Sequence, residues 1–128
     1  MVIDSSALLA ILFDEPERRQ FNEKIEADEI RLISAASYLE TAIIIDDRLG
    51  HEGARDLKLL MAEAEIEVVP VTIEQAEIAR EAYRSYGRGN HPAGLNHGDC
   101  LAYALAKATQ QALLFKGNDF EKTDIAAA

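Results

Sequence analysis

Residues 66–75 have the sequence Ile66-Glu67-Val68-Val69-Pro70-Val71-Thr72-Ile73-Glu74-Gln75, in which a strand leads directly into a helix. The run Ile66–Val71 is rich in β-branched side chains, which favour strands. Thr72 and Gln75 have the spacing of a capping box, which predicts a helix from there to about Tyr86. A strand followed at once by a helix is the repeating unit of α/β folds.

The same pattern recurs along the whole chain. Three more apolar segments are expected to be strands: Met1–Asp4, Ile30–Ile33 and Ala112–Phe115. Further helices are expected over Ala7–Asp14, Glu17–Asp28, Ala35–Leu49, Glu52–Glu65 and His97–Thr109. Ser5 or Ser6 should cap the first helix and Asn96 the last, Gly50 should end the third, and the trailing alanines should fray. Alternating strands and helices predict an α/β fold with a central, mainly parallel sheet.

Length and cysteine usage limit the class of protein. A chain of 128 residues fits one compact domain, residues 1–128, without room for a second core. The single cysteine, Cys100, excludes an internal disulfide framework and suits a reducing compartment. The apolar run Ala7–Phe13 is too short to cross a bilayer, and no Lys or Arg precedes it as in a signal peptide. We therefore expect a cytoplasmic protein without a membrane partner.

The charge balance is strongly acidic. With 23 acidic and 13 basic residues, the formal net charge is -10. This charge argues against a non-specific grip on nucleic acid, which depends on Lys and Arg at the phosphates. It does not argue against a site in which bound divalent ions reverse the local sign. It also predicts affinity for a basic protein partner, because opposite fields steer association.

Four acidic residues fall where an α/β sheet places its functional site, at the carboxyl ends of the strands. Asp4 ends the first expected strand, and Asp119 follows the last one after a short turn. Glu40 and Asp99 lie in the first two turns of expected helices. Asp4, Glu40 and Asp99 are surrounded by apolar sequence, where a carboxylate is costly to bury unless it is paired or bound to a metal.

Each of these acids also has an ordinary structural explanation. Asp99 lies three residues after Asn96 and could be a capping-box acid. Asp119 could cap a terminal turn, Asp4 could accept backbone N–H bonds at a strand end, and Glu40 could be solvated. The ordinary explanations weaken jointly, because four independent residues would have to share one edge of one sheet.

The chemistry of the four acids favours a hard cation. Carboxylate oxygens suit Mg²⁺ or Mn²⁺ rather than zinc. The three histidines, His51, His91 and His97, include no pair at helical ligand spacing, so a zinc site is not expected.

Four segments resemble, in order, the acidic motifs of PIN-domain nucleases. They are Val2–Leu8 around Asp4, Ser37–Glu40, Leu95–Ala106 around Asp99, and Leu114–Phe120 with Thr123-Asp124 around Asp119. The third segment is the most specific of the four. One departure is Asn118, where PIN domains often carry another aspartate. The match is closest to the VapC-type ribonucleases of bacterial toxin–antitoxin pairs.

The resemblance implies a three-layer PIN-like fold and a Mg²⁺- or Mn²⁺-dependent endoribonuclease. Its implied catalytic and metal-binding residues are Asp4, Glu40, Asp99 and Asp119. Implied supporting residues are Ser6, Asn96 and Asn118, and candidate RNA contacts are Arg80, Arg84 and Arg88. The implied partners are an RNA substrate, a cognate antitoxin and a second copy of the chain in a homodimer. The antitoxin is expected to dock near Leu8, Leu9, Leu12, Phe13 and Ile43–Ile45.

Two other classes of protein remain open from the residues. One is another α/β phosphate enzyme with Asp4 as nucleophile. Phosphatases of the HAD type carry a second aspartate two residues after the first, where this chain has Ser6. Receiver domains carry an adjacent acidic pair and a placed lysine, and neither is clear in this sequence. The other class is a binding module without activity, whose acids recognise a basic partner.

Overall fold

The centre of the molecule is a sheet of four short strands. The computed structural model describes residues 1–128, and its strands are β1 (Val2–Ile3), β2 (Leu32–Ser34), β3 (Glu67–Val69) and β4 (Leu113–Leu114). Their order is β3-β2-β1-β4, and every neighbouring pair is parallel. The predicted α/β class is confirmed. β3 ends before Pro70, because proline has no N–H to donate to a neighbouring strand.

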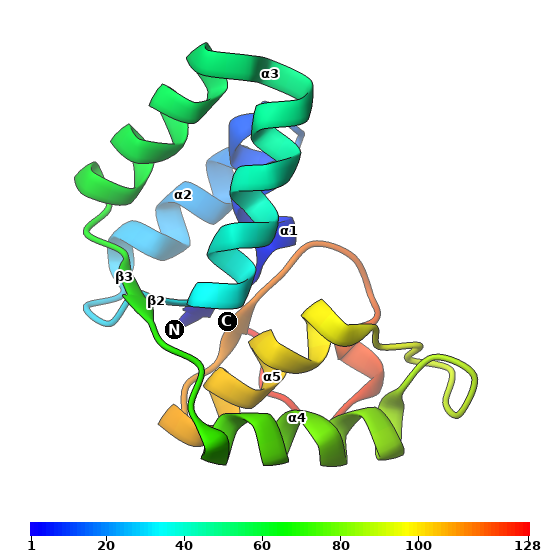
Figure 1. The fold of residues 1–128 in the computed structure, drawn as a ribbon. Coiled ribbons are helices and arrows are strands. Elements are labelled where there is room, and N and C mark those ends of the chain that lie inside the picture. The colour runs from blue at the N-terminus through cyan, green and yellow to red at the C-terminus, as the bar shows by residue number, and fades with distance from the viewer.

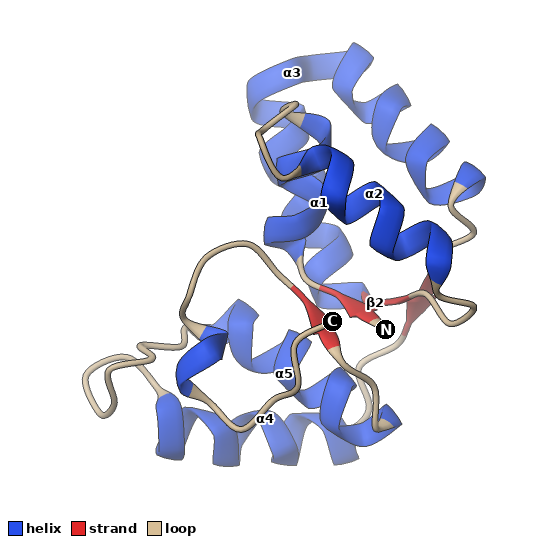
Figure 2. Cartoon of the chain, turned by 180° about the vertical axis from the view of Figure 1, so that it is seen from behind, coloured by secondary structure: helices blue, strands red, loops and turns tan.

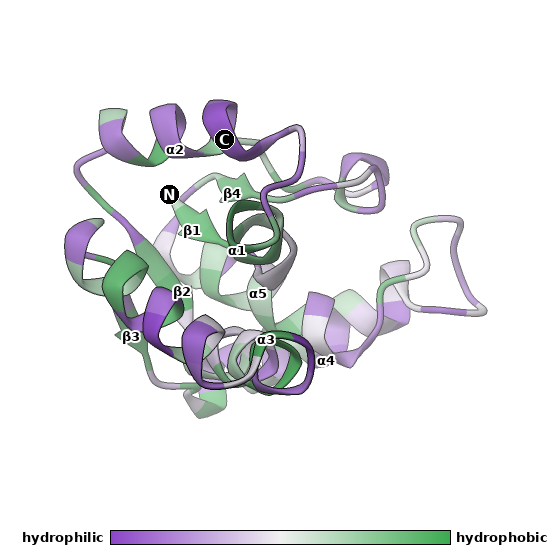
Figure 3. Cartoon of the chain, turned by 90° about the horizontal axis from the view of Figure 1, so that it is seen from above, coloured by the Kyte–Doolittle hydropathy of each residue, from purple (hydrophilic) through white to green (hydrophobic).

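Helices cover both faces of this sheet and form three layers (Figures 1 and 2). One layer contains α1 (Ser5–Leu12), α2 (Arg18–Ala27) and α3 (Ala35–Glu63), and the other contains α4 (Ile73–Tyr86) and α5 (His97–Thr109). Successive residues of β1 face opposite layers, because side chains alternate along a strand. Val2 packs in the apolar cluster of α4 and α5, and Ile3 packs in that of α1, α2 and α3. Figure 3 shows β1, β4 and α1 as apolar, whereas α2 is mostly polar.

The long helix α3 consists of two helical segments joined at Gly50. The backbone there has φ 60° and ψ -146°, a conformation open to glycine because it has no Cβ. Figure 1 shows the resulting sharp bend. The predicted helix end at Gly50, with a second helix directly after it, is confirmed. None of the helices combines the length and apolar character that crossing a bilayer requires.

The helix starts differ from the prediction at one place. Asp4, and not Ser5 or Ser6, caps α1: its side chain accepts the Ser6 backbone N–H. The prediction was wrong because β1 passes into α1 through one extended residue, so the helix begins two residues earlier than expected. Thr72 and Asn96 cap α4 and α5 as predicted.

The last residues of the chain are held against the sheet. The Leu113 N–H donates to the Ala126 carbonyl, and the Ala128 N–H donates to the Leu113 carbonyl, both at 2.9 Å. The prediction that the trailing alanines fray was therefore wrong, because a backbone pairing beside β4 needs no sequence signal from side chains. A side-chain hydrogen bond also holds this segment: the Tyr103 hydroxyl donates to Asp124 Oδ1 at 2.6 Å.

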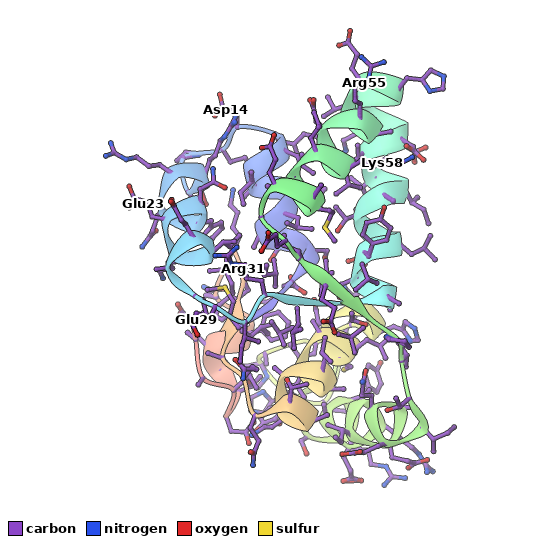
Figure 4. The ribbon with its side chains drawn as sticks, turned by 90° about the vertical axis from the view of Figure 1, so that its left-hand side faces the viewer. Asp14, Glu23, Glu29, Arg31, Arg55 and Lys58 are labelled. Atoms are coloured by element: carbon purple, nitrogen blue, oxygen red, sulfur yellow. The ribbon has the colours of Figure 1, made fainter.

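Arg31, labelled in Figure 4, connects α2 to the end of α3. Its guanidinium donates to the carbonyls of Glu26, Asp28 and Ala64 at 3.0, 2.8 and 2.8 Å. These carbonyls lie at helix ends, where unpaired acceptors carry partial negative charge. One side chain thereby holds together the layer that covers the α1 face of the sheet.

Candidate active site

Asp4 lies where β1 passes into α1, and its side chain is almost fully buried, with 4% exposed. Both hydrogen bonds to it, from the Ser6 backbone N–H (3.1 Å) and hydroxyl (2.6 Å), reach Oδ2. Burial raises the pKa of Asp4 to about 6, and the negative charges of Asp99 and Glu40 add to the rise, against the effect of the Ser6 bonds. Oδ1 of Asp4 accepts no hydrogen bond.

Glu40, in the second turn of α3, reaches back to the start of α1. The Ser5 hydroxyl donates to its Oε1 at 2.5 Å. Its Oε2 lies against Gly98 of α5, where an added Cβ would be 2.8 Å from that oxygen. Glu40 is therefore confined between two helices, with Oε2 free of hydrogen bonds.

Asp99, in the first turn of α5, forms a complete capping box with Asn96. The Asp99 N–H donates to Asn96 Oδ1 at 2.9 Å, and the Asn96 N–H donates to Asp99 Oδ2 at 3.0 Å. Burial raises the pKa of Asp99, with Asp119 and Glu40 adding to the rise and Arg88 opposing it. The ordinary explanation of Asp99 as a capping acid is therefore correct, and it coexists with membership of the acidic group.

Of the four acidic side chains, that of Asp119 is the least constrained by neighbouring residues. It is exposed and lies directly before the short 3₁₀ turn Phe120–Lys122, without a side-chain capping bond. Its negative charge nevertheless acts on Asp99. Figure 1 shows the segment after β4 arching over to the start of α5. Asn118 is exposed and its side chain makes no hydrogen bond.

Three of these carboxylates share one arrangement that fits a hard cation. Asp4, Glu40 and Asp99 each use one oxygen in a positioning hydrogen bond and keep the other oxygen free. No three His, Cys, Asp or Glu side chains converge as a ready-made ligand group, so binding would need side-chain rotation. The negative charges of Asp99 and Glu40 help to raise the pKa of Asp4, those of Asp119 and Glu40 help to raise the pKa of Asp99, and a divalent cation would oppose both effects. The donor set thus fits Mg²⁺ or Mn²⁺.

Lys116 and Ser6 connect the loop after β4 to Asp4. The Ser6 hydroxyl accepts the Lys116 backbone N–H at 3.0 Å while donating to Asp4. The Lys116 ammonium pairs with Glu15 at 2.9 Å and with Glu17 at 3.3 Å, so it is not a counterion for the acidic group. Lys116 thereby holds one end of the loop that carries Asp119.

Sequence reasoning missed Ser5 and Gly98 as residues that position Glu40. The signal for Ser5 was the run Asp4-Ser5-Ser6, in which both serines were considered as helix caps but only Ser6 as a supporting residue of the acidic site. The signal for Gly98 was a glycine in the first turn of a strong helix, where its low helix propensity calls for a reason.

The three arginines proposed as RNA contacts do not all lie in the same place in the structure. Arg80 and Arg88 line a pocket between α4 and α5, next to Asn96 and His97. Arg84 does not line it and pairs with Glu81 at 2.6 Å.

Cys100 is buried, and no cationic side chain lowers the pKa of its thiol. Burial, with a contribution from Asp99, raises the pKa of its thiol to about 11. At neutral pH Cys100 is therefore a thiol rather than the reactive thiolate.

The sequence model of the family described as PIN domain matches residues 1–126. The chain belongs to the PIN-domain family. Among the relatives of this PIN domain, Ribonuclease VapC30 of Mycobacterium tuberculosis (strain ATCC 25618 / H37Rv) is 56% identical over 126 residues, with 98% of this chain and 96% of that protein covered. Ribonuclease VapC of Mycolicibacterium smegmatis (strain ATCC 700084 / mc(2)155) is 54% identical over 127 residues, with 99% and 98% covered. The resemblance to the VapC group is confirmed.

Solved structures show the same fold as this PIN domain. Mycobacterium tuberculosis VapC20, described as a Sarcin-Ricin loop cleaving toxin, has a TM-score of 0.79 at 15% identity, with 99% of this chain and 97% of that chain covered. A toxin-antitoxin complex from Klebsiella pneumoniae has a TM-score of 0.73 at 18% identity, with 99% and 95% covered. These likenesses confirm the three-layer PIN-like fold. Family membership also excludes the phosphatase and receiver alternatives, which are different families.

Proposed function

We propose that this PIN domain is a divalent-metal-dependent endoribonuclease and the toxin of a toxin–antitoxin pair. The observation that carries the proposal is that Asp99 and Glu40 lie close enough to Asp4 for their charges to raise its pKa, while each of the three keeps one carboxylate oxygen free of hydrogen bonds. Relatives that share more than half of its residues over nearly its whole length are named ribonucleases. An RNA substrate inside the cell also gives this PIN domain a cytoplasmic place of action.

The residues that would hold Mg²⁺ or Mn²⁺ are Asp4, Glu40, Asp99 and Asp119. A bound divalent ion lowers the pKa of a coordinated water and neutralises charge on the reacting phosphate, so no histidine base is required. The loosely held Asp119 would complete the group from the loop after β4. Hydrolysis of this type leaves 5′-phosphate and 3′-hydroxyl ends.

Hydrogen bonds from neighbouring residues orient the proposed ligands. Ser6 orients Asp4, Ser5 orients Glu40, and Asn96 orients Asp99, each by a bond to one carboxylate oxygen, which would leave the other oxygen for the ion. Such partners fix ligand geometry and are costly to lose. Asn118, beside Asp119, would support the fourth position.

A cognate antitoxin is the proposed protein partner. A group of carboxylates without enough cation is a natural receptor for an arginine, whose planar fork pairs with carboxylates. An antitoxin arginine placed there would compete with Mg²⁺, so excess Mg²⁺ should weaken inhibition. The docking surface expected from the sequence needs revision, because Leu8 and Ile45 are fully buried core residues. Of that surface, Ile43 remains exposed.

A homodimer is the proposed assembly state. Leu39 and Ile43 of α3 are 58% and 53% exposed and lie on the groove that also contains Glu40. Burying these side chains between two copies would remove apolar surface from water. Sedimentation of the natural protein should give a dimer, and Ile43→Glu should give a monomer; a natural monomer would contradict this assembly.

The experiment that tests the proposed function is RNA cleavage with Mg²⁺, with Mn²⁺ and with EDTA. The natural protein should cleave only with metal and leave 5′-phosphate ends. Asp99→Asn should be inactive, whereas Asp47→Asn, the same change at an exposed position of α3, should remain active. RNA or partner binding without cleavage under every metal condition would instead favour a binding module.

A further inference from the structure

A pocket of about 520 Å³ lies between α4 and α5, which pack side by side on one face of the sheet (Figures 1 and 2). Its lining includes four small or apolar side chains, the exposed Ala76 and the buried Ala79 from α4 with Cys100 and Leu101 from α5. The alanines leave space that larger side chains would fill in a close-packed interface. These four side chains carry no charge and suit contact with a flat, uncharged ring.

Planar side chains make up most of the remaining lining. Arg80 and Tyr83 come from α4, Arg88 from the following loop, and His97 from the start of α5. The Tyr83 ring is 43% exposed, and its hydroxyl makes no hydrogen bond. Guanidinium, phenol and imidazole planes are the groups on which unpaired bases stack in RNA-binding proteins.

The charge of the pocket is opposite to that of the whole chain. In a protein with net charge -10, the lining contains two arginines, one histidine and no Asp or Glu. Arg88 forms no ion pair, and Arg80 has only the exposed Glu77 at 3.6 Å. Because an exposed pair of this kind contributes little free energy, both arginines are free to meet phosphates.

The pocket adjoins the proposed metal site through Asn96. Asn96 lines the pocket and also forms the capping box with Asp99. The Arg88 N–H donates to the Leu95 carbonyl at 3.0 Å, which closes the base of the loop and holds Arg88 beside Asn96. A nucleotide in the pocket would therefore adjoin a phosphate at the carboxylates.

We propose that this pocket binds an unpaired nucleobase of the RNA next to the phosphodiester that is cut, with Arg80 and Arg88 on the adjoining phosphates. The inference rests on the proposed ribonuclease function and adds a site that selects single-stranded RNA. A pocket of this volume is within the range that holds small organic groups. A base stacked inside a duplex cannot enter it, so double-stranded RNA is excluded.

The test is metal-free binding of a labelled, random-sequence, single-stranded RNA decamer, measured by fluorescence anisotropy in EDTA at low salt. Tyr83→Leu keeps apolar bulk without a stacking plane and should weaken binding about five- to hundredfold, whereas Tyr83→Phe should bind like the natural protein. Arg88→Ala should weaken binding at least about fivefold. Arg19→Ala is the charge control, because Arg19 is an exposed arginine of α2 paired with Glu23, and it should change affinity by less than about twofold.

Several results would overturn the pocket as a base site. They are no binding by the natural protein, equal binding by Tyr83→Leu and Tyr83→Phe, equal losses in Arg88→Ala and Arg19→Ala, or duplex RNA that binds as tightly as the single strand. Cleavage with Mg²⁺, measured in parallel, separates this inference from the proposed function. Cleavage that is indifferent to Tyr83→Leu removes the base site and leaves the ribonuclease standing. RNA binding that depends on Tyr83 and Arg88, without any cleavage, would support the base site and contradict the proposed ribonuclease function.

Discussion

Gly98 of α5 lies directly against Glu40 of α3, so that a Cβ atom at position 98 would be 2.8 Å from Glu40 Oε2. Alanine would otherwise suit this helical position better than glycine, by about 0.5–1 kcal/mol. The structure therefore offers a reason for glycine that concerns the carboxylate rather than the helix.

Gly98→Ala should separate activity from stability. The melting temperature should stay the same or rise, because the obstructed atom is the end of a flexible side chain that can move aside. RNA cleavage and Mn²⁺ affinity should each fall about tenfold or more, as when partners of metal ligands are lost. In a Glu40→Ala background, where the obstructed carboxylate is gone, the same substitution should not lower Mn²⁺ affinity further, and an equal loss of affinity in both backgrounds would show that Gly98 acts by another route.

Asp4 should make the metal-free protein less stable as the pH rises. An aspartate ordinarily has a pKa of 3.8, whereas burial raises the pKa of Asp4 to about 6 in the folded protein, so the folded state holds the proton more tightly than the unfolded state. The Asp4 contribution to the free energy of unfolding is therefore greatest below pH 4 and falls by up to about 3 kcal/mol by pH 6.

Asp4→Asn should remove that dependence, because asparagine is nearly isosteric and is also a good N-cap. Chemical denaturation in EDTA between pH 4 and 7.5 measures the difference between the two proteins, in which the other titrating groups largely cancel. The variant should be the more stable at pH 7 and inactive on RNA. If the free energy of unfolding changed with pH in the same way in both proteins, ionisation of Asp4 would not destabilise the folded state, and the prediction would be contradicted.

Mn²⁺ should stabilise the natural protein through the acidic group. A ligand that binds only the folded state adds about 2.7 kcal/mol at a hundredfold excess over its dissociation constant. The rise in melting temperature should be much smaller for Asp99→Asn than for the exposed control Asp47→Asn. Equal rises in all three proteins would indicate general screening of the -10 charge instead.

Tyr103→Phe should destabilise the protein without affecting the metal response. The substitution removes the hydrogen bond to Asp124, which holds the last residues beside β4. We expect a loss of about 1 kcal/mol in the free energy of unfolding, because Asp124 is partly solvated. Tyr83→Phe removes a hydroxyl without a partner and serves as the matched control. An equal loss in both variants would mean that the Asp124 bond contributes nothing.

The sequence was sufficient to place the elements and the acids that lie at their ends. The positions of Asp4 and Asp99 could be predicted because each lies at or within one turn of the start of a helix, and local residues signal both helix starts. The bend at Gly50 was predictable for the same reason, since glycine is the residue that a positive φ requires.

The contacts that shape the site were not predictable from the sequence. Ser5 meets Glu40, and Gly98 meets the same carboxylate, across separations that only the packing of α1, α3 and α5 determines. The pocket beside Arg88 depends on how α4 packs on α5. The pairing of Ala128 with Leu113 uses backbone groups alone, which every residue type carries.

The most direct test of the central claim is to locate Mn²⁺ by its anomalous scattering in crystals of the natural protein. We predict a manganese peak bound to the free oxygens of Asp4 and Asp99, with Glu40 and Asp119 directly or through water. The peak should be absent in Asp99→Asn crystals soaked in the same way. An active natural protein whose crystals hold Mn²⁺ elsewhere, or hold none at saturating concentration, would contradict the account.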